Sequence, residues 1–267
     1  MTASPTPNAA DADVLFDLSA GIATLTLNRA AGYNTLTSDV IATLNTHLAA
    51  IAASAETRVV IIAATGKAFS TGHDLKEMNA QRDEVFYRQL LAACARMMQS
   101  IVALPQPVIA QVQGIATAAG CQLVASCDLA VAARSARFAT NGITNGLYCA
   151  TPSVALSRVV QRKHALEMLL TGNFIDAARA AEIGLVNHVV DDVDLATTTR
   201  ALADRIADKS QYAVRLGKAS FYRQLEQGLD SAYRGTSEEL VGNLLANDGI
   251  EGLNAFIEKR PPHWQDC

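Results

Sequence analysis

Two short segments of this chain carry residue types that could hold a developing negative charge. They are GKAFSTGHDLKEM at positions 66–78 and QGIATAAGCQ at positions 113–122. Each follows an apolar, strand-like run and leads into a predicted helix. The first backbone N–H groups of a helix have no partner inside the helix, and two of them aimed at one carbonyl oxygen form an oxyanion hole. The two segments therefore predict a site where backbone N–H groups stabilise an oxyanion.

Glycines set the expected geometry of both turns. We place a tight bend at Gly72, because glycine adopts positive φ and lets another group approach the backbone closely. The helix after it is expected to begin at His73 or Asp74, with its free N–H groups directed outward. The same reasoning applies to residues 118–120. A glycine-rich turn between a strand and a helix usually has only a structural role, so the prediction depends on the two turns acting together.

The elements around these turns have the pattern of an α/β protein. Two short runs rich in β-branched residues, 14–18 and 22–27, predict a hairpin. Three uninterrupted apolar runs predict strands buried on both faces: residues 59–64, 108–112 and 129–133. Helices are expected from Thr37 or Ser38 to about residue 53 and over residues 83–104. This alternation predicts a largely parallel sheet with right-handed crossovers.

The organisation changes near residue 191, after which only helical patterns remain. We expect those helices at residues 194–207, 211–227, 231–247 and 250–259. The chain is therefore predicted to have three parts: a disordered N-terminal arm (1–13), an α/β core (14–191) and a C-terminal helical region (192–267).

Composition and charge exclude several classes of protein. The net charge of −4 and the absence of a long basic run argue against nucleic-acid binding, and no apolar stretch is long enough to cross a membrane. The five cysteines show no paired CxxC spacing, and the N-terminus has no signal or transit peptide. We therefore expect reduced thiols and a cytoplasmic protein, with no metal site and no permanently bound cofactor.

The two turns and their flanks resemble the crotonase superfamily, which is the enoyl-CoA hydratase/isomerase family. The supporting stretches span roughly residues 14–264: LNR (27–29), NTL (34–36), AFSTGHDLK (68–76), PVIA (107–110), QG (113–114), GCQL (120–123), CD (127–128), ALEMLLTG (165–172) and ARAAEIGLVN (178–187). Residues 116–128, 146–152 and 216–222 resemble one branch of it in particular. The resemblance implies a ClpP-like ββα superhelical core, and C-terminal helices that form a homotrimer or a hexamer of two trimers.

The resemblance also implies a ligand, an acyl-CoA or enoyl-CoA thioester, with coenzyme A bound only as part of the substrate. By position, the backbone N–H groups of His73 and Ala119 would hold the thioester oxygen. The family usually has glycine at position 119, so the hole requires negative φ at this alanine. Two further runs match positions that contact coenzyme A: Ala31, Gly32 and Tyr33, and Asp74, Leu75 and Lys76. Asp74 also fits a helix cap, and Lys76 also fits a solvated helix lysine.

This chain departs from the family at both acid–base positions. Typical hydratases use two glutamates, and the matching positions here hold Gln122 and Gly142. An amide or a hydrogen atom cannot transfer protons near neutral pH, so we expect hydratase activity to be weak or absent. Cys149 is a possible acid–base or nucleophilic group, although a buried cysteine is often inert. The His73 ring has a suitable pKa range, but its side chain can point away from the ligand.

These observations leave three functions open. The first is an enzyme of fatty acid metabolism, a lyase or isomerase of the hydratase/isomerase type that acts on an acyl-CoA. The second is a non-catalytic acyl-CoA-binding or assembly subunit, and the third is an unrelated α/β binding module. The sequence does not specify the acyl group.

Overall fold

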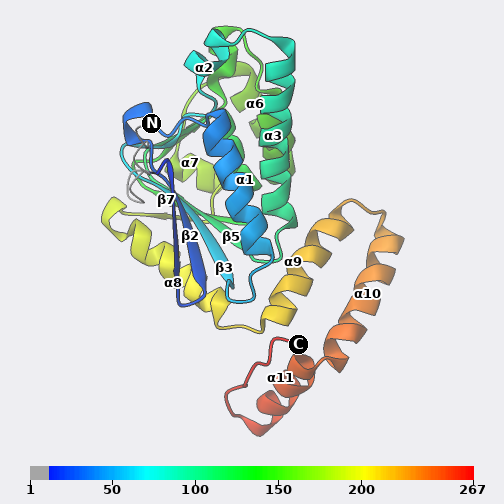
Figure 1. Ribbon diagram of the computed structural model, residues 1–267. Helices are drawn as coiled ribbons and strands as arrows, with labels where there is room; N and C mark the ends of the chain where they lie inside the picture. Colours follow the sequence, from blue (N-terminus) through cyan, green and yellow to red (C-terminus); the bar gives the residue numbers. More distant parts are fainter. Residues whose placement is uncertain (1–11) are drawn as a thin grey trace, which may run out of the picture.

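The computed structural model of the protein describes residues 12–267 (Figure 1). The predicted disordered arm, residues 1–13, therefore lies outside the described residues except for Ala12 and Asp13.

The larger of two sheets has six strands in the order β1-β2-β3-β5-β7-β10. The first two strands form the predicted antiparallel hairpin, and the pairs from β2 onward are parallel. The bounds are β1 (Val14–Ser19), β2 (Ile22–Leu27), β3 (Val59–Ala64), β5 (Val108–Val112), β7 (Leu129–Ala133) and β10 (His188–Val190). The three predicted internal strands are confirmed, and the α/β fold with a largely parallel sheet is correct.

Burial on both faces explains why β3 is apolar throughout. Val60 and Ile62 join the main core, while Val59 and Ile61 join a second cluster on the opposite face. Helices α1 (Ser38–Ala52) and α3 (Glu84–Ala103) cover the first face, and α8 (Leu195–Ala207) covers the second (Figure 1). Burying one such aliphatic side chain stabilises the fold by about 1.5–3 kcal/mol, so both layers contribute.

A second, smaller sheet was not predicted from the sequence. It has the order β4-β6-β8-β9, formed by β4 (Ala68–Ser70), β6 (Ile115–Thr117), β8 (Arg137–Ala139) and β9 (Ile175–Asp176). Each of its first three strands follows closely on a strand of the larger sheet, which gives the ββα repeat. Segments of three residues are too short to show a hydrophobic period, so the residues of β4 and β6 were predicted as parts of turns.

The remaining short elements connect the two sheets. They are η2 (Ala30–Gly32), α2 (Leu75–Ala80), α4 (Ala119–Ser126), η3 (Asn141–Asn145), α5 (Ala150–Val159), α6 (Arg162–Thr171), α7 (Ala177–Glu182) and η4 (Asp192–Asp194). All eight residues of α4 are buried, so this helix lies at the centre of the molecule. Its first turn is one of the two segments that the sequence singled out.

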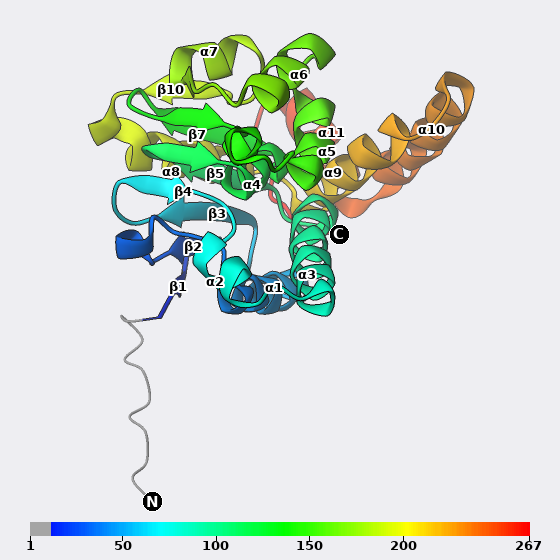
Figure 2. The same ribbon diagram turned by 90° about the horizontal axis from the view of Figure 1, so that it is seen from above.

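The C-terminal helices extend away from the sheets. They are α9 (Gln211–Leu225), α10 (Leu229–Leu245) and α11 (Asn247–Glu258), and Figures 1 and 2 show α10 projecting from the core. After β10 the described chain contains only helices, as expected. The break between α10 and α11 comes earlier than predicted, at Ala246, which has extended backbone with φ −69° and ψ 155°.

A buried ion pair attaches α9 to the sheets. Lys218 Nζ lies 2.6 Å from Asp128 Oδ2 and also donates to the carbonyl oxygens of Ile101 and Gln106. Asp128 accepts two further hydrogen bonds, from Val108 N–H and from the Tyr222 hydroxyl. The Lys218 side chain is only 7% exposed, so this contact is a desolvated, fully hydrogen-bonded pair.

Within residues 12–267, no helix is both long enough and apolar enough to cross a membrane.

Candidate acyl-thioester site

A cavity of about 790 Å³ opens beside the first turn of α4. Its wall combines residues from both predicted turns with residues from η2, α3, η3 and α5. Ten of the residues predicted from the sequence line it: Ala31, Gly32, Tyr33, His73, Asp74, Leu75, Lys76, Ala119, Gly142 and Cys149. The fold therefore gathers one candidate site from segments more than 100 residues apart.

The two turns meet through glycines that allow backbone to approach backbone. Gly72 has φ 85°, and a Cβ added to it would lie 2.9 Å from the amide nitrogen of Ala119. A Cβ on Gly120 would lie 2.1 Å from the carbonyl oxygen of Ser70. A larger residue at either position would push β4 and α4 apart.

This contact brings Gly72, the residue before His73, against the backbone of Ala119, and both His73 and Ala119 line the cavity. Ala119 is the first residue of α4, where a backbone N–H has no partner inside the helix. Within residues 12–267, neither N–H group donates a hydrogen bond to another protein group. The pair is therefore available to a carbonyl oxygen of a ligand.

Within residues 118–120, where the second bend was predicted, the residue with positive φ is Ala118 and not the glycine. Ala118 has φ 49° and ψ −120°, while Ala119 has negative φ as part of the helix. A non-glycine residue in such a region stores strain of about 1–3 kcal/mol. This conformation of Ala118 connects β6 to α4, which begins at the next residue, Ala119.

Ala118→Gly is expected to raise the free energy of unfolding by about 1 kcal/mol, because glycine adopts this conformation without a Cβ clash. Urea denaturation of both proteins measures the difference. Ala119→Gly is the matched control: its helical φ carries no such strain, so the same change there lowers stability slightly. A destabilising Ala118→Gly would show that this backbone is not strained.

The His73 side chain does not present a nitrogen to the cavity. Both ring nitrogens are buried, and neither has a hydrogen-bond partner in the described part of the chain. Burial lowers the pKa of His73, and the nearby Leu36 carbonyl and Glu77 only partly oppose this effect. The ring is thus neutral at pH 7 and enclosed by protein, and only the backbone of His73 can act on a ligand.

Position 142 has no room for a side chain. A Cβ on Gly142 would lie 2.6 Å from the carbonyl oxygen of Leu147 and 2.9 Å from Cys149 Sγ. The thiol of Cys149 therefore occupies the space beside this position. Burial raises the pKa of Cys149, against the effect of a hydrogen bond from the Gly142 backbone, so the thiol is protonated near pH 7. A protonated thiol is a poor base and a poor nucleophile.

Gln122 is the one predicted site residue that does not line the cavity. It is buried in the first turns of α4, and its Oε1 has no hydrogen-bond partner among residues 12–267.

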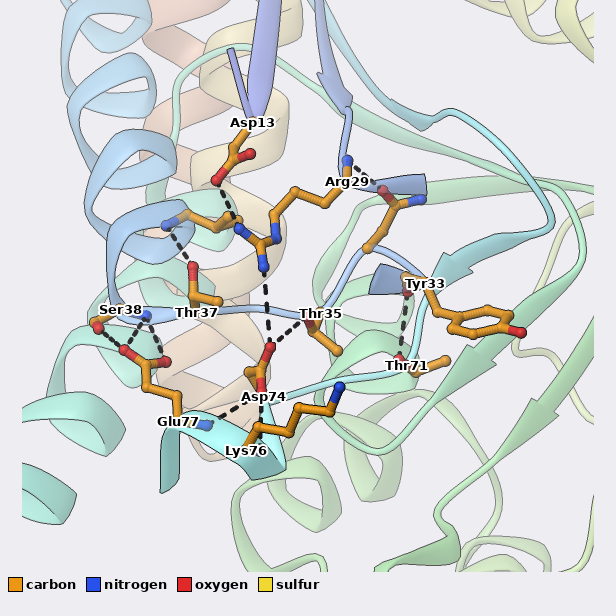
Figure 3. Close-up of polar contacts among 12 residues, drawn as sticks. Asp13, Arg29, Tyr33, Thr35, Thr37, Ser38, Thr71, Asp74, Lys76 and Glu77 are labelled. Carbon is orange, nitrogen blue, oxygen red and sulfur yellow. Dashed lines mark hydrogen bonds and ion pairs between the residues drawn. The ribbon is translucent and has the colours of Figure 1, made fainter. Parts of the chain in front are cut away.

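Charged groups gather at the start of α2 (Figure 3). Asp74 caps the helix by accepting hydrogen bonds from the N–H groups of Lys76 and Glu77, and its other oxygen accepts from the Thr35 hydroxyl. Arg29 lies between Asp13, at 2.9 Å, and Asp74, at 3.9 Å. Burial opposes ionisation of Asp74, but these hydrogen bonds and Arg29 outweigh it and lower the pKa of Asp74.

Several cavity residues were not identified from the sequence. They include Thr35, Met78, Leu91, Ile115, Leu147 and Phe174. They come from six different segments, and no local motif connects them. Within residues 12–267, no cluster of three or more His, Cys, Asp or Glu side chains could hold a metal ion.

Comparison with known proteins identifies relatives over nearly the whole chain. The sequence profile described as enoyl-CoA hydratase/isomerase matches residues 17–267. The chain is 51% identical over 199 residues to the mitochondrial enoyl-CoA hydratase domain-containing protein 3 of Xenopus laevis, covering 74% of this chain and 68% of that protein. The human protein of the same name is 49% identical over 199 residues, covering 74% of this chain and 66% of that protein.

Solved structures agree in fold. A crystal structure of an enoyl-CoA hydratase from Mycobacterium smegmatis superposes with a TM-score of 0.93 at 48% identity, covering 95% of this chain and 99% of that chain. Human enoyl-CoA hydratase domain-containing protein 3 superposes with a TM-score of 0.93 at 44% identity, covering 95% of this chain and 100% of that chain.

The relatives contradict the predicted cytoplasmic location. Five of them, at 45–51% identity, are named as mitochondrial proteins. The prediction relied on the composition of residues 1–13, which carries no positive signal for any compartment, and it is wrong.

Proposed function

The chain belongs to the enoyl-CoA hydratase/isomerase (crotonase) family, and we propose that it binds the thioester of an acyl-CoA or enoyl-CoA in the cavity beside α4. The thioester oxygen accepts hydrogen bonds from the N–H groups of His73 and Ala119. One observation supports this assignment: Gly72 packs against the start of α4, and both His73 and Ala119 line the cavity. Each donor of this kind typically contributes roughly 3 kcal/mol to stabilising a developing oxyanion.

Coenzyme A enters as part of the substrate, along the segment that carries Ala31, Gly32 and Tyr33. These residues and Lys76 lie on the same cavity wall. Within residues 12–267 the Lys76 ammonium has no hydrogen-bond or ion-pair partner, so it is free to meet a phosphate.

The proposed chemistry is polarisation of the thioester with little proton transfer. Hydration needs one group to activate water and another to protonate the α-carbon. Gln122 cannot exchange a proton, and Gly142 has no side chain and no space for one. The Cys149 thiol is protonated, and the His73 nitrogens are enclosed. Any hydratase or isomerase step is therefore slow.

The same observations support a second function, a non-catalytic acyl-CoA-binding subunit. The enzyme and the non-catalytic subunit differ in catalytic turnover, which can be assayed over a broad panel of thioesters. Turnover that Cys149→Ser abolishes would favour an enzyme with an unusual acid–base group. Binding without turnover of any ester would favour the subunit.

Calorimetric titration tests the binding proposal. We expect octanoyl-CoA to bind more tightly than free coenzyme A, because only the ester has a thioester carbonyl oxygen for the two N–H groups. Ala119→Pro removes the N–H at the first residue of α4, and it should weaken binding of the ester while leaving binding of free coenzyme A unchanged. Circular dichroism checks that the variant folds. If no CoA ester binds to the wild-type protein, the proposal is wrong.

The C-terminal helices also favour self-association into a trimer or a hexamer. Large apolar side chains are exposed on α9, α10 and α11, with Phe256 83% and Leu229 76% exposed. An apolar surface of this kind usually contacts another subunit. Light scattering gives the subunit number, and a monomer at micromolar concentration would contradict this proposal.

A further inference from the structure

Gly72, the residue before His73, is held by hydrogen bonds on both of its backbone polar groups. Its N–H donates to the Ser70 hydroxyl oxygen at 3.3 Å, and its carbonyl oxygen accepts from the Leu36 N–H at 2.8 Å. The Ser70 hydroxyl in turn donates to the carbonyl oxygen of Asn34 at 2.8 Å. The segment that contains Asn34 and Leu36 therefore holds Gly72 twice, once directly and once through Ser70.

The bond to Leu36 sets the direction of the His73 N–H. The carbonyl group of Gly72 and the N–H of His73 belong to one planar trans peptide, so the two groups point in opposite directions. Because the carbonyl points at Leu36, the His73 N–H points away from Leu36. His73 lines the cavity, and its N–H has no protein partner within residues 12–267. Fixing Gly72 thus fixes the direction of one of the two proposed donors.

The Asn34 side chain fixes the segment that holds Gly72. This amide is buried: its Oδ1 accepts from the Arg29 N–H at 2.8 Å, and its Nδ2 donates to the carbonyl oxygens of Thr65 and Ala68, at 2.8 and 2.7 Å. These partners lie just after β2, just after β3 and at the start of β4. Asn34 is therefore anchored to strands of both sheets.

The backbone of this segment has an unusual conformation. Tyr33 and Asn34 have φ of 52° and 53°, in the left-handed region, which asparagine tolerates and which tyrosine rarely occupies. The Tyr33 carbonyl oxygen accepts from the Thr71 N–H at 3.2 Å and from the Thr71 hydroxyl (Figure 3). Backbone of this kind persists only where its surroundings hold it, and it is common at functional sites. Here both carbonyl oxygens are directed at residues 70–71, which lead into Gly72.

We propose that Ser70 is a positioning residue of the oxyanion site: it joins Asn34 to Gly72 and so holds the His73 N–H in the direction that meets a thioester oxygen. The inference rests on the proposed acyl-CoA function. Ser70 is fully buried and does not line the cavity, so its hydroxyl acts on the ligand only through the backbone. The donor is in place before a ligand arrives, and such preorganised N–H groups stabilise an oxyanion most effectively.

Ser70→Ala tests this role, because it removes both hydrogen bonds of the hydroxyl. The readout is infrared spectroscopy of bound octanoyl-CoA labelled with ¹³C at the thioester carbonyl. We expect the shift of the carbonyl stretch on binding to fall to at most about half of the wild-type shift. In calorimetry the ester should bind at least about threefold more weakly, with binding of free coenzyme A unchanged. A hydroxyl that only stabilises the fold would leave the carbonyl frequency of the bound ester unchanged.

Ser126→Ala is the matched control. The Ser126 hydroxyl is also buried, at 4% exposure, and donates to a backbone carbonyl oxygen, that of Gln122, at the same distance of 2.8 Å. It lies at the opposite end of α4 from Ala119. We expect this variant to keep the wild-type carbonyl shift. An equal reduction in both variants would overturn the proposal, because the loss of any buried hydroxyl nearby would then disturb the site.

Circular dichroism checks that each variant folds. If Ser70→Ala does not fold, Ser70→Cys fills the same space with a weak donor and acceptor, and the same reduced shift is expected. The full wild-type shift in a folded Ser70 variant would overturn the positioning role and leave the proposed function intact. Failure of the wild-type protein to bind any CoA ester would instead refute the proposed function, and this inference with it.

Discussion

We expect the wild-type protein to hydrate crotonyl-CoA at least about 10⁴-fold more slowly than a hydratase with both catalytic glutamates. One positioned acid or base typically contributes 10²–10⁴-fold, and both positions lack a proton-transfer group here. Gln122 is an amide. Position 142 has no room for a side chain, because a Cβ there would meet the Leu147 carbonyl oxygen and Cys149 Sγ. The loss of absorbance of the enoyl thioester follows the reaction, and calorimetry confirms that the substrate binds.

Two variants test whether positions 122 and 142 behave as this explanation of the slow hydration requires. Gln122→Ala should leave the slow rate unchanged, because the amide transfers no proton. Gly142→Glu should not raise the rate and should destabilise the fold, since its Cβ would lie 2.6 Å from a backbone oxygen. A wild-type rate within tenfold of an ordinary hydratase would contradict the account, because some other group would then be moving protons.

Lys218→Met is expected to lower the free energy of unfolding by about 3–5 kcal/mol, the usual effect of leaving one member of a buried ion pair unpaired. Asp128 would keep its hydrogen bonds from Val108 and Tyr222 but lose its cation, and two backbone carbonyls would lose a donor. Burial lowers the pKa of Lys218, and the adjacent Asp128 only partly opposes this effect. Urea denaturation measures the change.

Lys209→Met is the matched control, because the Lys209 side chain is 64% exposed and, among residues 12–267, pairs only with the exposed Asp208. It should change stability by less than about 0.5 kcal/mol. The double variant Lys218→Met/Asp128→Asn should recover part of the loss, since it removes the uncompensated charge. A loss below about 1 kcal/mol in Lys218→Met would mean that α9 is held mainly by apolar packing.

Strong local patterns made much of the larger sheet predictable. The apolar run of β3 and the polar cap of α1 each predict an element from local sequence alone. The cap is present in the structure, where the Thr37 side chain accepts a hydrogen bond from Val40 N–H. The short strands β4 and β6 were missed because their pairing depends on one another and not on any local period. The superhelical core was predicted from the resemblance to a known family and not from local patterns.

The site was predictable only in part for the same reason. Glycine at positions 72 and 120 indicated close backbone approach, yet the strained residue is Ala118, an alanine that no sequence rule marks for positive φ. The orientation of the His73 ring depends on packing around Leu36 and Glu77, which lie on other elements. Leu91 and Phe174 reach the cavity only through the tertiary fold, so their place in its wall could not be predicted from the sequence.

The central claim is that two backbone N–H groups, of His73 and Ala119, polarise a bound thioester. Infrared spectroscopy of a CoA ester labelled with ¹³C at the thioester carbonyl measures this polarisation directly. We predict that the carbonyl stretch moves to lower wavenumber on binding to the wild-type protein, and moves less in Ala119→Pro. A bound ester with the same carbonyl frequency as the free ester would contradict the account.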